Sequence, residues 1–163
     1  MSLSMLGSAH MAAAIASLLF GLMVLLERKG TQTHRTIGAA YVAAMIATNL
    51  TALGVYRLTG QFGPFHALAL LSLATLVHGV LAALRRRPGW LATHYYSMAW
   101  SYVGLLAAAA AEFVARSPLL AGVVRDGRSG MLVGLACTAV FLALGFVVIP
   151  RLQARALAGF GER

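Results

Sequence analysis

Acidic side chains are almost missing from this sequence, and charged side chains of either sign are few. Only 4 Asp and Glu occur among 163 residues, and charged residues make up 10% of the chain. A soluble domain usually carries about a quarter of its residues charged. Because 60% of the residues are apolar, this composition excludes an ordinary soluble domain. With so few acids, catalysis by paired carboxylates is not expected either.

Cysteine is present only once, as Cys137 inside an apolar run. A disulfide within the chain and a CxxC metal site are therefore excluded, and Cys137 is expected to be a small packing residue. The sequence also lacks the GxSxG, HExxH, GxGxxG and Walker patterns of common enzyme classes. No Lys or Arg occurs from Met1 to Met11, so no cleavable signal peptide is expected.

Long apolar runs are what the sequence has in place of charge. Each has about 20 residues, enough for a helix to cross the hydrocarbon core of a bilayer, and none alternates like a barrel strand. We predict an all-α integral membrane protein: one transmembrane domain whose first four helices form a bundle with a fifth, peripheral helix. Pro150 is expected to end the last span. The predicted spans are residues 6–26, 37–58, 64–84, 93–115 and 130–149.

The basic residues fall between these runs, so the net charge of +9 is interpreted as a topology signal rather than as a nucleic-acid footprint. Nine basic residues would share one side of the membrane: Arg28, Lys29, Arg35, Arg85, Arg86, Arg87, Arg151, Arg155 and Arg163. Four would lie on the other: Arg57, Arg116, Arg125 and Arg128. The excess of basic residues places the first group in the cytoplasm and the N-terminus outside. The expected partner is the lipid bilayer, and no nucleic-acid partner is expected.

Ionisable side chains inside a membrane are costly and usually functional. Five histidines and Glu112 lie in or beside the first four spans. The topology predicts an inner cluster of His34, His78 and His94, with His78 about 9 Å below the surface at 1.5 Å per residue. It predicts an outer cluster of His10, His66 and Glu112.

Three uses of these side chains remain open. Histidines from facing helices can hold a haem b. Three histidines, or two with Glu112, can hold zinc or copper. Neutral imidazoles can also handle protons or ligands. Near the interface, a histidine can instead cap a helix or meet headgroups without any cofactor.

Two histidine motifs resemble those of a known family. His34-Arg35-Thr36-Ile37-Gly38-Ala39-Ala40-Tyr41 resembles an HRxxGxxY element, and Thr93-His94 with Met98, Ser101 and Tyr102 resembles an AHxxxMxxSY element. Both are similar to motifs of small bacterial membrane proteins of unknown function. The likeness covers spans one to four, and Tyr95-Tyr96 stands where the family has basic residues. The four-helix core is also similar in outline to cytochrome b561-type dihaem proteins, an architectural analogy.

The leading hypothesis is a haem b-type electron-transfer module, or a subunit of a membrane redox complex, in a bacterial inner membrane. His34, His78 and His94 would supply inner ligands, and His10 and His66 outer ones. The shared pattern adds Arg35, Tyr41, Met98 and Tyr102 to the expected cofactor site, with Arg35 as a cation for a haem propionate or a lipid phosphate. The alternatives are a non-haem zinc or copper protein, and an accessory or assembly subunit without a cofactor. A homo-oligomer is compatible with all three.

Overall fold

The computed structural model describes residues 5–54, 61–117 and 126–158, and every regular element in these ranges is an α-helix. Each helix is long and apolar enough to cross a membrane. The predicted all-α membrane fold is therefore confirmed. The helices are α1 (Met5–Leu26), α2 (Gln32–Leu53), α3 (Pro64–Arg85), α4 (Trp90–Arg116) and α5 (Gly127–Ala158).

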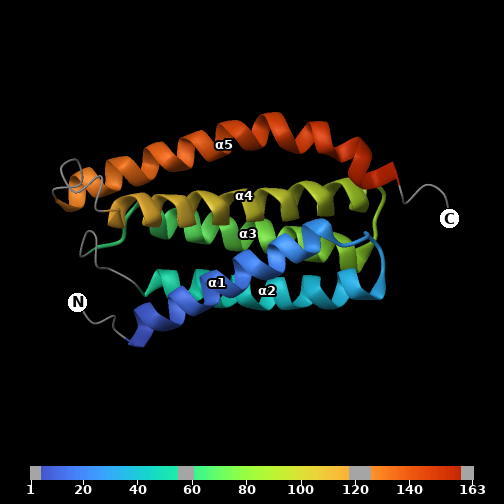
Figure 1. Ribbon diagram of the computed structural model, residues 1–163. Coiled ribbons are helices and arrows are strands. Elements are labelled where there is room, and N and C mark those ends of the chain that lie inside the picture. The colour runs from blue at the N-terminus through green and yellow to red at the C-terminus, as the bar shows by residue number, and fades with distance from the viewer. Residues whose placement is uncertain (1–4, 55–60, 118–125, 159–163) are drawn as a thin grey trace.

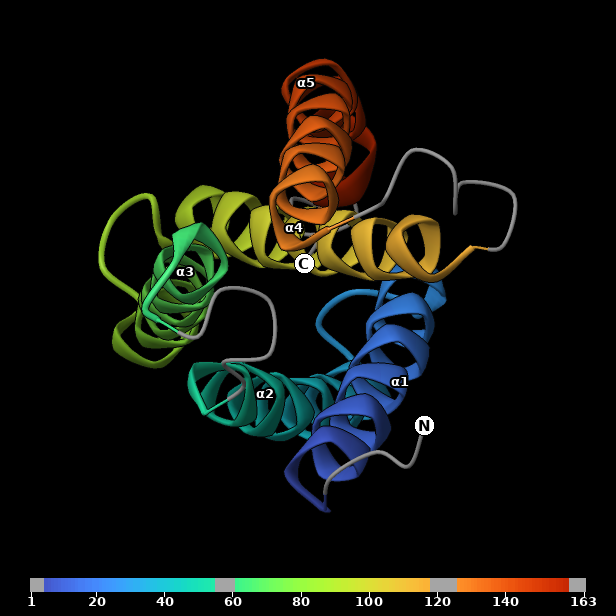
Figure 2. The same cartoon turned by 90° about the vertical axis from the view of Figure 1, so that its left-hand side faces the viewer.

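The first four helices surround a common interior, and α5 lies outside them (Figures 1 and 2). Helix α1 packs against α2 and α4, and α3 packs against the same two helices from the other side. Helices α2 and α4 therefore stand on one diagonal of the bundle, and α1 and α3 on the other. Helix α5 packs along α4, as predicted for a peripheral helix. Since neighbours in the chain run antiparallel, α2 and α4 run in the same direction.

Each end of the bundle has its own set of connections (Figure 1). The end at which α1, α3 and α5 finish is called the basic end, because eight basic residues of the described chain lie there: Arg28, Lys29, Arg35, Arg85, Arg86, Arg87, Arg151 and Arg155. The other is called the far end. Of the four basic residues predicted at the far end, Arg128 is described, whereas Arg57, Arg125 and the side chain of Arg116 lie outside the described residues. Arg163, the ninth basic residue predicted at the basic end, lies outside them too.

Helix α2 begins five residues before the predicted apolar run, at Gln32 rather than residue 37. Thr31 explains this start, because its hydroxyl accepts the backbone N–H of His34 at 3.1 Å. Such a cap satisfies one of the free donors of a first helical turn. At its other end the helix stops at Leu53, and residues 55–58 of the predicted span lie outside the described residues. The early start places His34 on the helix rather than before it.

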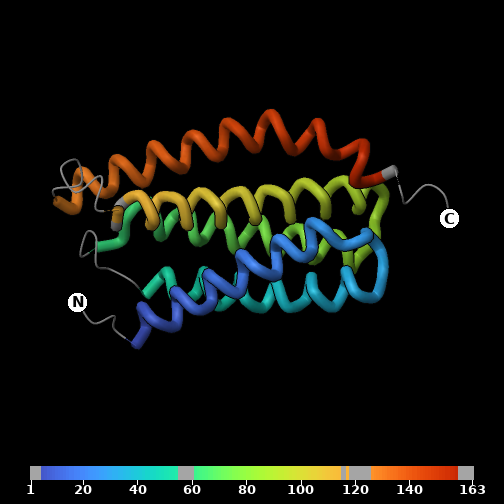
Figure 3. Tube along the Cα trace, in the orientation of Figure 1, coloured from blue at the N-terminus to red at the C-terminus, as the bar shows by residue number. Residues whose placement is uncertain are grey.

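The prediction that Pro150 ends the fifth span is wrong, because α5 continues through Pro150 to Ala158. Proline removes one donor from a helix and clashes with the preceding turn, which usually bends it. The tube in Figure 3 shows α5 arching over α4 and returning to it at the basic end. Two tyrosines of α4 hold this returning segment: Tyr95 OH donates to Ile149 O at 2.8 Å, and Tyr96 OH donates to Gln153 Oε1 at 2.6 Å.

Small polar side chains are buried in the bundle, while large apolar ones face outwards. Ser17, Ser101 and Asn49 are at most 5% exposed, whereas Leu19 and Leu71 are more than half exposed. Lipid is as apolar as leucine, so packing and interhelical hydrogen bonds hold such helices together. The Ser17 and Thr48 hydroxyls, 3.1 Å apart, link α1 to α2 in this way. The interior is thus a place where polar groups are organised.

Candidate functional site

The two sequence motifs meet across the interior of the bundle. Tyr41 OH of α2 and Ser101 Oγ of α4 are 2.8 Å apart and buried, although their helices stand on a diagonal. His34 lies seven residues before Tyr41, and His94 lies seven residues before Ser101. Seven residues are nearly two turns, about 10.5 Å along a helix axis and almost the same face. Because α2 and α4 run in the same direction, His34 and His94 lie at the same height in the bundle, about two helical turns from the Tyr41–Ser101 bond towards the basic end.

His94 is fixed in one tautomer by its contact with α3. Its Nδ1 lies 2.9 Å from the carbonyl oxygen of Gly79. A carbonyl only accepts hydrogen bonds, so Nδ1 carries the hydrogen and Nε2 of the neutral ring is left with a free lone pair. Histidines that ligate metals usually donate their other ring N–H to a carbonyl or carboxylate. His94 is therefore prepared to coordinate through Nε2.

His34 reaches the interior from the first turn of α2. Its Nδ1 is buried and, within the residues that the structure describes, has no hydrogen-bond partner. The ring is also close enough to His94 for the two imidazoles to interact electrostatically. A buried polar nitrogen without a hydrogen-bond partner costs free energy, and such atoms are rare in folded proteins. His34 and His94 thus form the candidate pair of this end of the bundle, and their role as an inner ligand cluster stays a prediction.

His78 does not join this pair, contrary to the prediction of a deep inner ligand. Its side chain is exposed, and its Nδ1 lies 3.2 Å from Ser97 Oγ. The reason is helical phase: the next residue, Gly79, is buried and faces α4, and one residue turns a helix by about 100°. His78 therefore lies on the outer side of the seam between α3 and α4.

The predicted outer pair is not assembled either. His10 Nδ1 turns to α2, 3.1 Å from Thr48 O and 3.0 Å from Thr51 Oγ1. His66 Nδ1 accepts the backbone N–H of Gly63 at 3.0 Å and so caps its own helix. The neutral His66 ring then carries its hydrogen on Nε2, which cannot coordinate a metal in that form. In the described chain, no hydrogen bond or electrostatic interaction joins His10 to His66.

Glu112 lies half-buried near the far end of α4, five turns from His94. Its predicted partner, Arg116, has a side chain outside the described residues. Among the residues that are described, no three His, Cys, Asp or Glu side chains lie close enough to hold a metal ion. The zinc or copper alternative, which needs at least three such ligands, thus receives no support from the geometry.

The remaining residues of the shared pattern lie on α2 and α4, and two of them contact a third helix. Tyr102 OH donates to Leu18 O of α1 at 3.2 Å, and its ring packs edge-on against Tyr41. Met98 packs beside Gly79, where an added Cβ would lie 3.0 Å from the Met98 sulfur. Arg35 is exposed next to His34. Pattern residues on α4 therefore contact α1, α2 and α3.

Sequence reasoning did not single out Gly79, whose carbonyl orients His94, or Ser101 as the partner of Tyr41. A signal for Ser101 existed, because the interval from His94 to Ser101 equals the interval from His34 to Tyr41. Equal spacing on two parallel helices predicts that both pairs face each other. No comparable signal marks Gly79, since a backbone carbonyl carries no sequence information.

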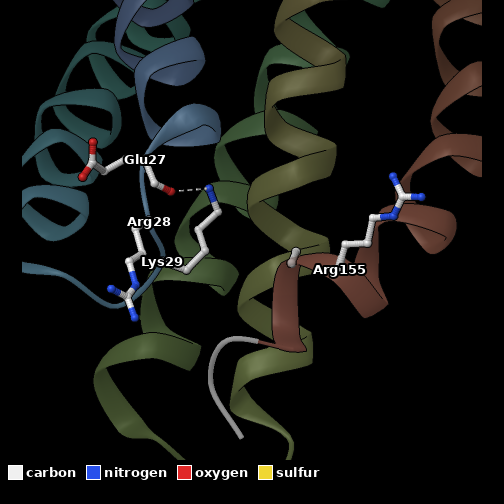
Figure 4. A pocket seen from close by; sticks show the side chains of 5 residues that line it. Glu27, Arg28, Lys29 and Arg155 are labelled. Carbon is white, nitrogen blue, oxygen red and sulfur yellow. Dashed lines mark hydrogen bonds between the residues drawn. The ribbon is translucent and has the colours of Figure 1, made fainter. Parts of the chain in front are cut away.

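A shallow cavity of about 250 Å³ at the basic end is lined by Glu27, Arg28, Lys29, Arg155 and Ala156. The Lys29 ammonium donates to the carbonyls of Val24, Leu25 and Glu27 at 2.7–3.0 Å and so caps α1. Figure 4 shows the last of these bonds, with the Glu27 carboxylate turned to the opposite side from Arg155. Burial lowers the pKa of Lys29, and the Glu27 charge partly opposes this. The Lys29 charge thus serves the fold.

Fold and site together define a polytopic helical membrane protein with a pair of histidines on diagonal helices. The chain belongs to the family described as "Predicted membrane protein (DUF2306)", whose profile matches residues 7–149. This match confirms the expected membrane protein family, and it extends beyond the first four spans into α5. No curated protein and no solved structure matches the chain.

Proposed function

We propose that the protein is a haem b-type electron-transfer module of the membrane, in which His34 and His94 would hold the haem. The observation that carries the proposal is their register: the Tyr41–Ser101 hydrogen bond crosses the bundle, and both histidines lie seven residues before it on the same faces. A group held between diagonal helices lies at the centre of the bundle, where all four helices enclose it.

The residues present fit a haem in three ways. His94 offers Nε2, because Gly79 O holds its Nδ1 hydrogen. His34 has a buried Nδ1 without a hydrogen-bond partner in the described chain. Rotation of the ring, or coordination of a metal by this nitrogen, would remove the free-energy cost of the missing partner. Arg35 is exposed beside His34 and can pair with a propionate carboxylate. When bound, haem b supplies a one-electron couple whose potential depends on its axial ligands and their hydrogen bonds.

The surrounding residues would hold this site rigid and dry. The Tyr41–Ser101 bond closes its lower side, and Ser101 also donates to Met98 O at 2.8 Å. Tyr41 is 2% exposed and Met45 is 1% exposed, so the packed core excludes water below the histidines. With one pair assembled, we propose one haem site near the basic end rather than two. Electrons would then pass to another membrane redox subunit through that end.

Orientation follows from charge. Among the described residues, eight basic side chains and Glu27 lie at the basic end, so 8 − 1 gives +7 there. Segments rich in Lys and Arg stay in the cytoplasm. We therefore propose that the basic end, with the haem site and the end of α5, faces the cytoplasm of a bacterial inner membrane.

The test is the haem content of the purified full-length chain, produced with haem precursor and measured as the pyridine haemochrome. We expect about one haem b per chain. His34→Ala and His94→Ala should each lower this to a small fraction. His78→Ala is the matched control, because His78 is exposed on α3, and it should keep the full amount.

Three outcomes would contradict the proposal. A colourless protein carrying stoichiometric zinc or copper supports the metal alternative, and a colourless, metal-free protein supports a cofactor-free accessory or assembly subunit. Equal haem loss in His78→Ala would show that the pair identified here is not the site. Size-exclusion chromatography and circular dichroism of each variant separate lost ligation from lost folding.

A further inference from the structure

A second cavity, of about 220 Å³, opens at the basic end, between the end of α3 and the start of α4. Its lining combines cations with apolar and aromatic groups. Those used below are His78, Leu81, Arg85, Arg87, Trp90 and Thr93. The cavity lies at the level where a helix leaves the hydrocarbon core, and it is separate from the His34–His94 pair.

The connection between the two helices presents its arginines in different directions. Arg86 ends α3 in the left-handed conformation, with φ of 46°. Its guanidinium lies over the Trp90 ring, 5.6 Å from the ring centroid, which is a favourable cation–π geometry. Arg85 and Arg87, on either side of it, are exposed and line the cavity. Two cations thus flank a pocket whose wall is an anchored indole.

These cations lack a counter-charge within the protein. In the part of the chain that the structure describes, the guanidinium groups of Arg85 and Arg87 have neither an ion pair nor a hydrogen-bond partner. Glu27 is the one acidic residue described at the basic end, on the α1–α2 connection. Unpaired arginines beside a membrane attract anionic headgroups, at about 1 kcal/mol for each basic residue.

We infer that this cavity binds the headgroup phosphate of an anionic phospholipid, held by Arg85 and Arg87. The Thr93 hydroxyl at the rim donates to Gly89 O at 3.3 Å and can accept from a headgroup hydroxyl, and Trp90 lies at the interfacial depth that tryptophan prefers. Below the headgroup, the exposed side chains of Leu81 and Val77 on α3 offer an apolar surface for the acyl chains. Binding at this site does not depend on haem.

The charged cavity beside Lys29 is a weaker candidate for the same ligand. Three backbone carbonyls occupy the Lys29 ammonium, and the lining of that cavity includes the carboxylate-bearing Glu27. Its lining also lacks an aromatic or large apolar side chain. The cavity beside Arg85 has both unpaired cations and apolar walls, so it matches a lipid rather than a free anion.

The experiment is native mass spectrometry of the delipidated full-length protein, titrated with phosphatidylglycerol or with phosphatidylcholine. Wild type should retain one phosphatidylglycerol in preference to phosphatidylcholine. Arg85→Gln with Arg87→Gln should weaken this binding by roughly thirtyfold, the factor expected for two lipid-phosphate contacts. The matched control is Arg28→Gln with Arg151→Gln, which removes the same charge from exposed positions of the same end and should change binding less than threefold.

Three further results decide the matter. Equal weakening in both double variants would overturn the site in favour of diffuse surface attraction. Displacement of the lipid by inorganic phosphate in excess would overturn the lipid assignment, because free phosphate lacks the acyl contacts. Leu81→Trp keeps every charge but fills the cavity, and it should abolish the preference for phosphatidylglycerol. Unchanged lipid binding in Leu81→Trp would contradict the proposal.

Discussion

The imidazole of His94 donates its Nδ1 hydrogen to the carbonyl oxygen of Gly79, 2.9 Å away on the neighbouring helix. This contact depends on close approach of α3 to α4. Gly79 is buried, and a Cβ added to it would lie 2.8 Å from Ser97 Cβ and 3.0 Å from the Met98 sulfur. The absence of a side chain on α3 therefore sets both the helix spacing and the tautomer of His94.

Gly79→Ala should destabilise the protein and weaken the cofactor site. The new methyl group must push α4 away, and overpacking of this kind costs about 1–3 kcal/mol. Gly104→Ala is the control, because no atom lies within 4 Å of a Cβ added to Gly104. Thermal unfolding in detergent should show a lower Tm for Gly79→Ala and an unchanged or slightly higher one for Gly104→Ala. Equal Tm values would show that α3 and α4 do not pack as described.

The hydrogen bond between Tyr41 and Ser101 should appear as a coupling energy. Tyr41→Phe and Ser101→Ala each remove one partner of a buried bond of 2.8 Å. A double-mutant cycle on unfolding free energies should give about 0.6–1.7 kcal/mol, the range found for such bonds in membrane proteins. Tyr102→Phe combined with Ser101→Ala is the comparison, because Tyr102 OH bonds to Leu18 O instead. Additive effects of Tyr41→Phe and Ser101→Ala would remove the evidence that α2 and α4 face each other at this level.

The helices could be predicted from the sequence because span length follows from bilayer thickness alone. Helix ends were less predictable where local contacts decide them. Thr31 starts α2 early through its cap, and Pro150 fails to end α5 because Tyr95 and Tyr96 hold the chain on both sides of it. The two tyrosine contacts join residues 54 and 57 positions apart, so composition and hydropathy cannot reveal them.

The site was predictable only in part. The motif spacing pointed to His34 and His94, and both residues lie seven positions before the Tyr41–Ser101 hydrogen bond on helices that run in the same direction. His78 was assigned by depth, but depth does not give the direction of a side chain, and helical phase turns it outwards. His66 was assigned by type, yet its ring nitrogen caps the turn that it begins. Depth and residue type thus identify candidates, and only packing selects among them.

The topology can be tested with single cysteines. Cys137→Ser removes the chain's one cysteine, and Arg87→Cys or Gln61→Cys then places a thiol at an exposed position of the basic end or the far end. A membrane-impermeant maleimide should label Gln61→Cys in spheroplasts and Arg87→Cys only after the membrane is permeabilised. The reverse pattern would place the basic end outside and overturn the proposed orientation.

The most direct test of the central claim is the axial ligation of the ferric protein, measured by near-infrared magnetic circular dichroism. Two imidazole ligands from His34 and His94 should give the band of bis-histidine haem. His34→Met should move it to the position of histidine–methionine ligation and raise the reduction potential. A bis-histidine band that persists unchanged in both His34→Met and His94→Met would contradict the account, because the ligands would then be other residues.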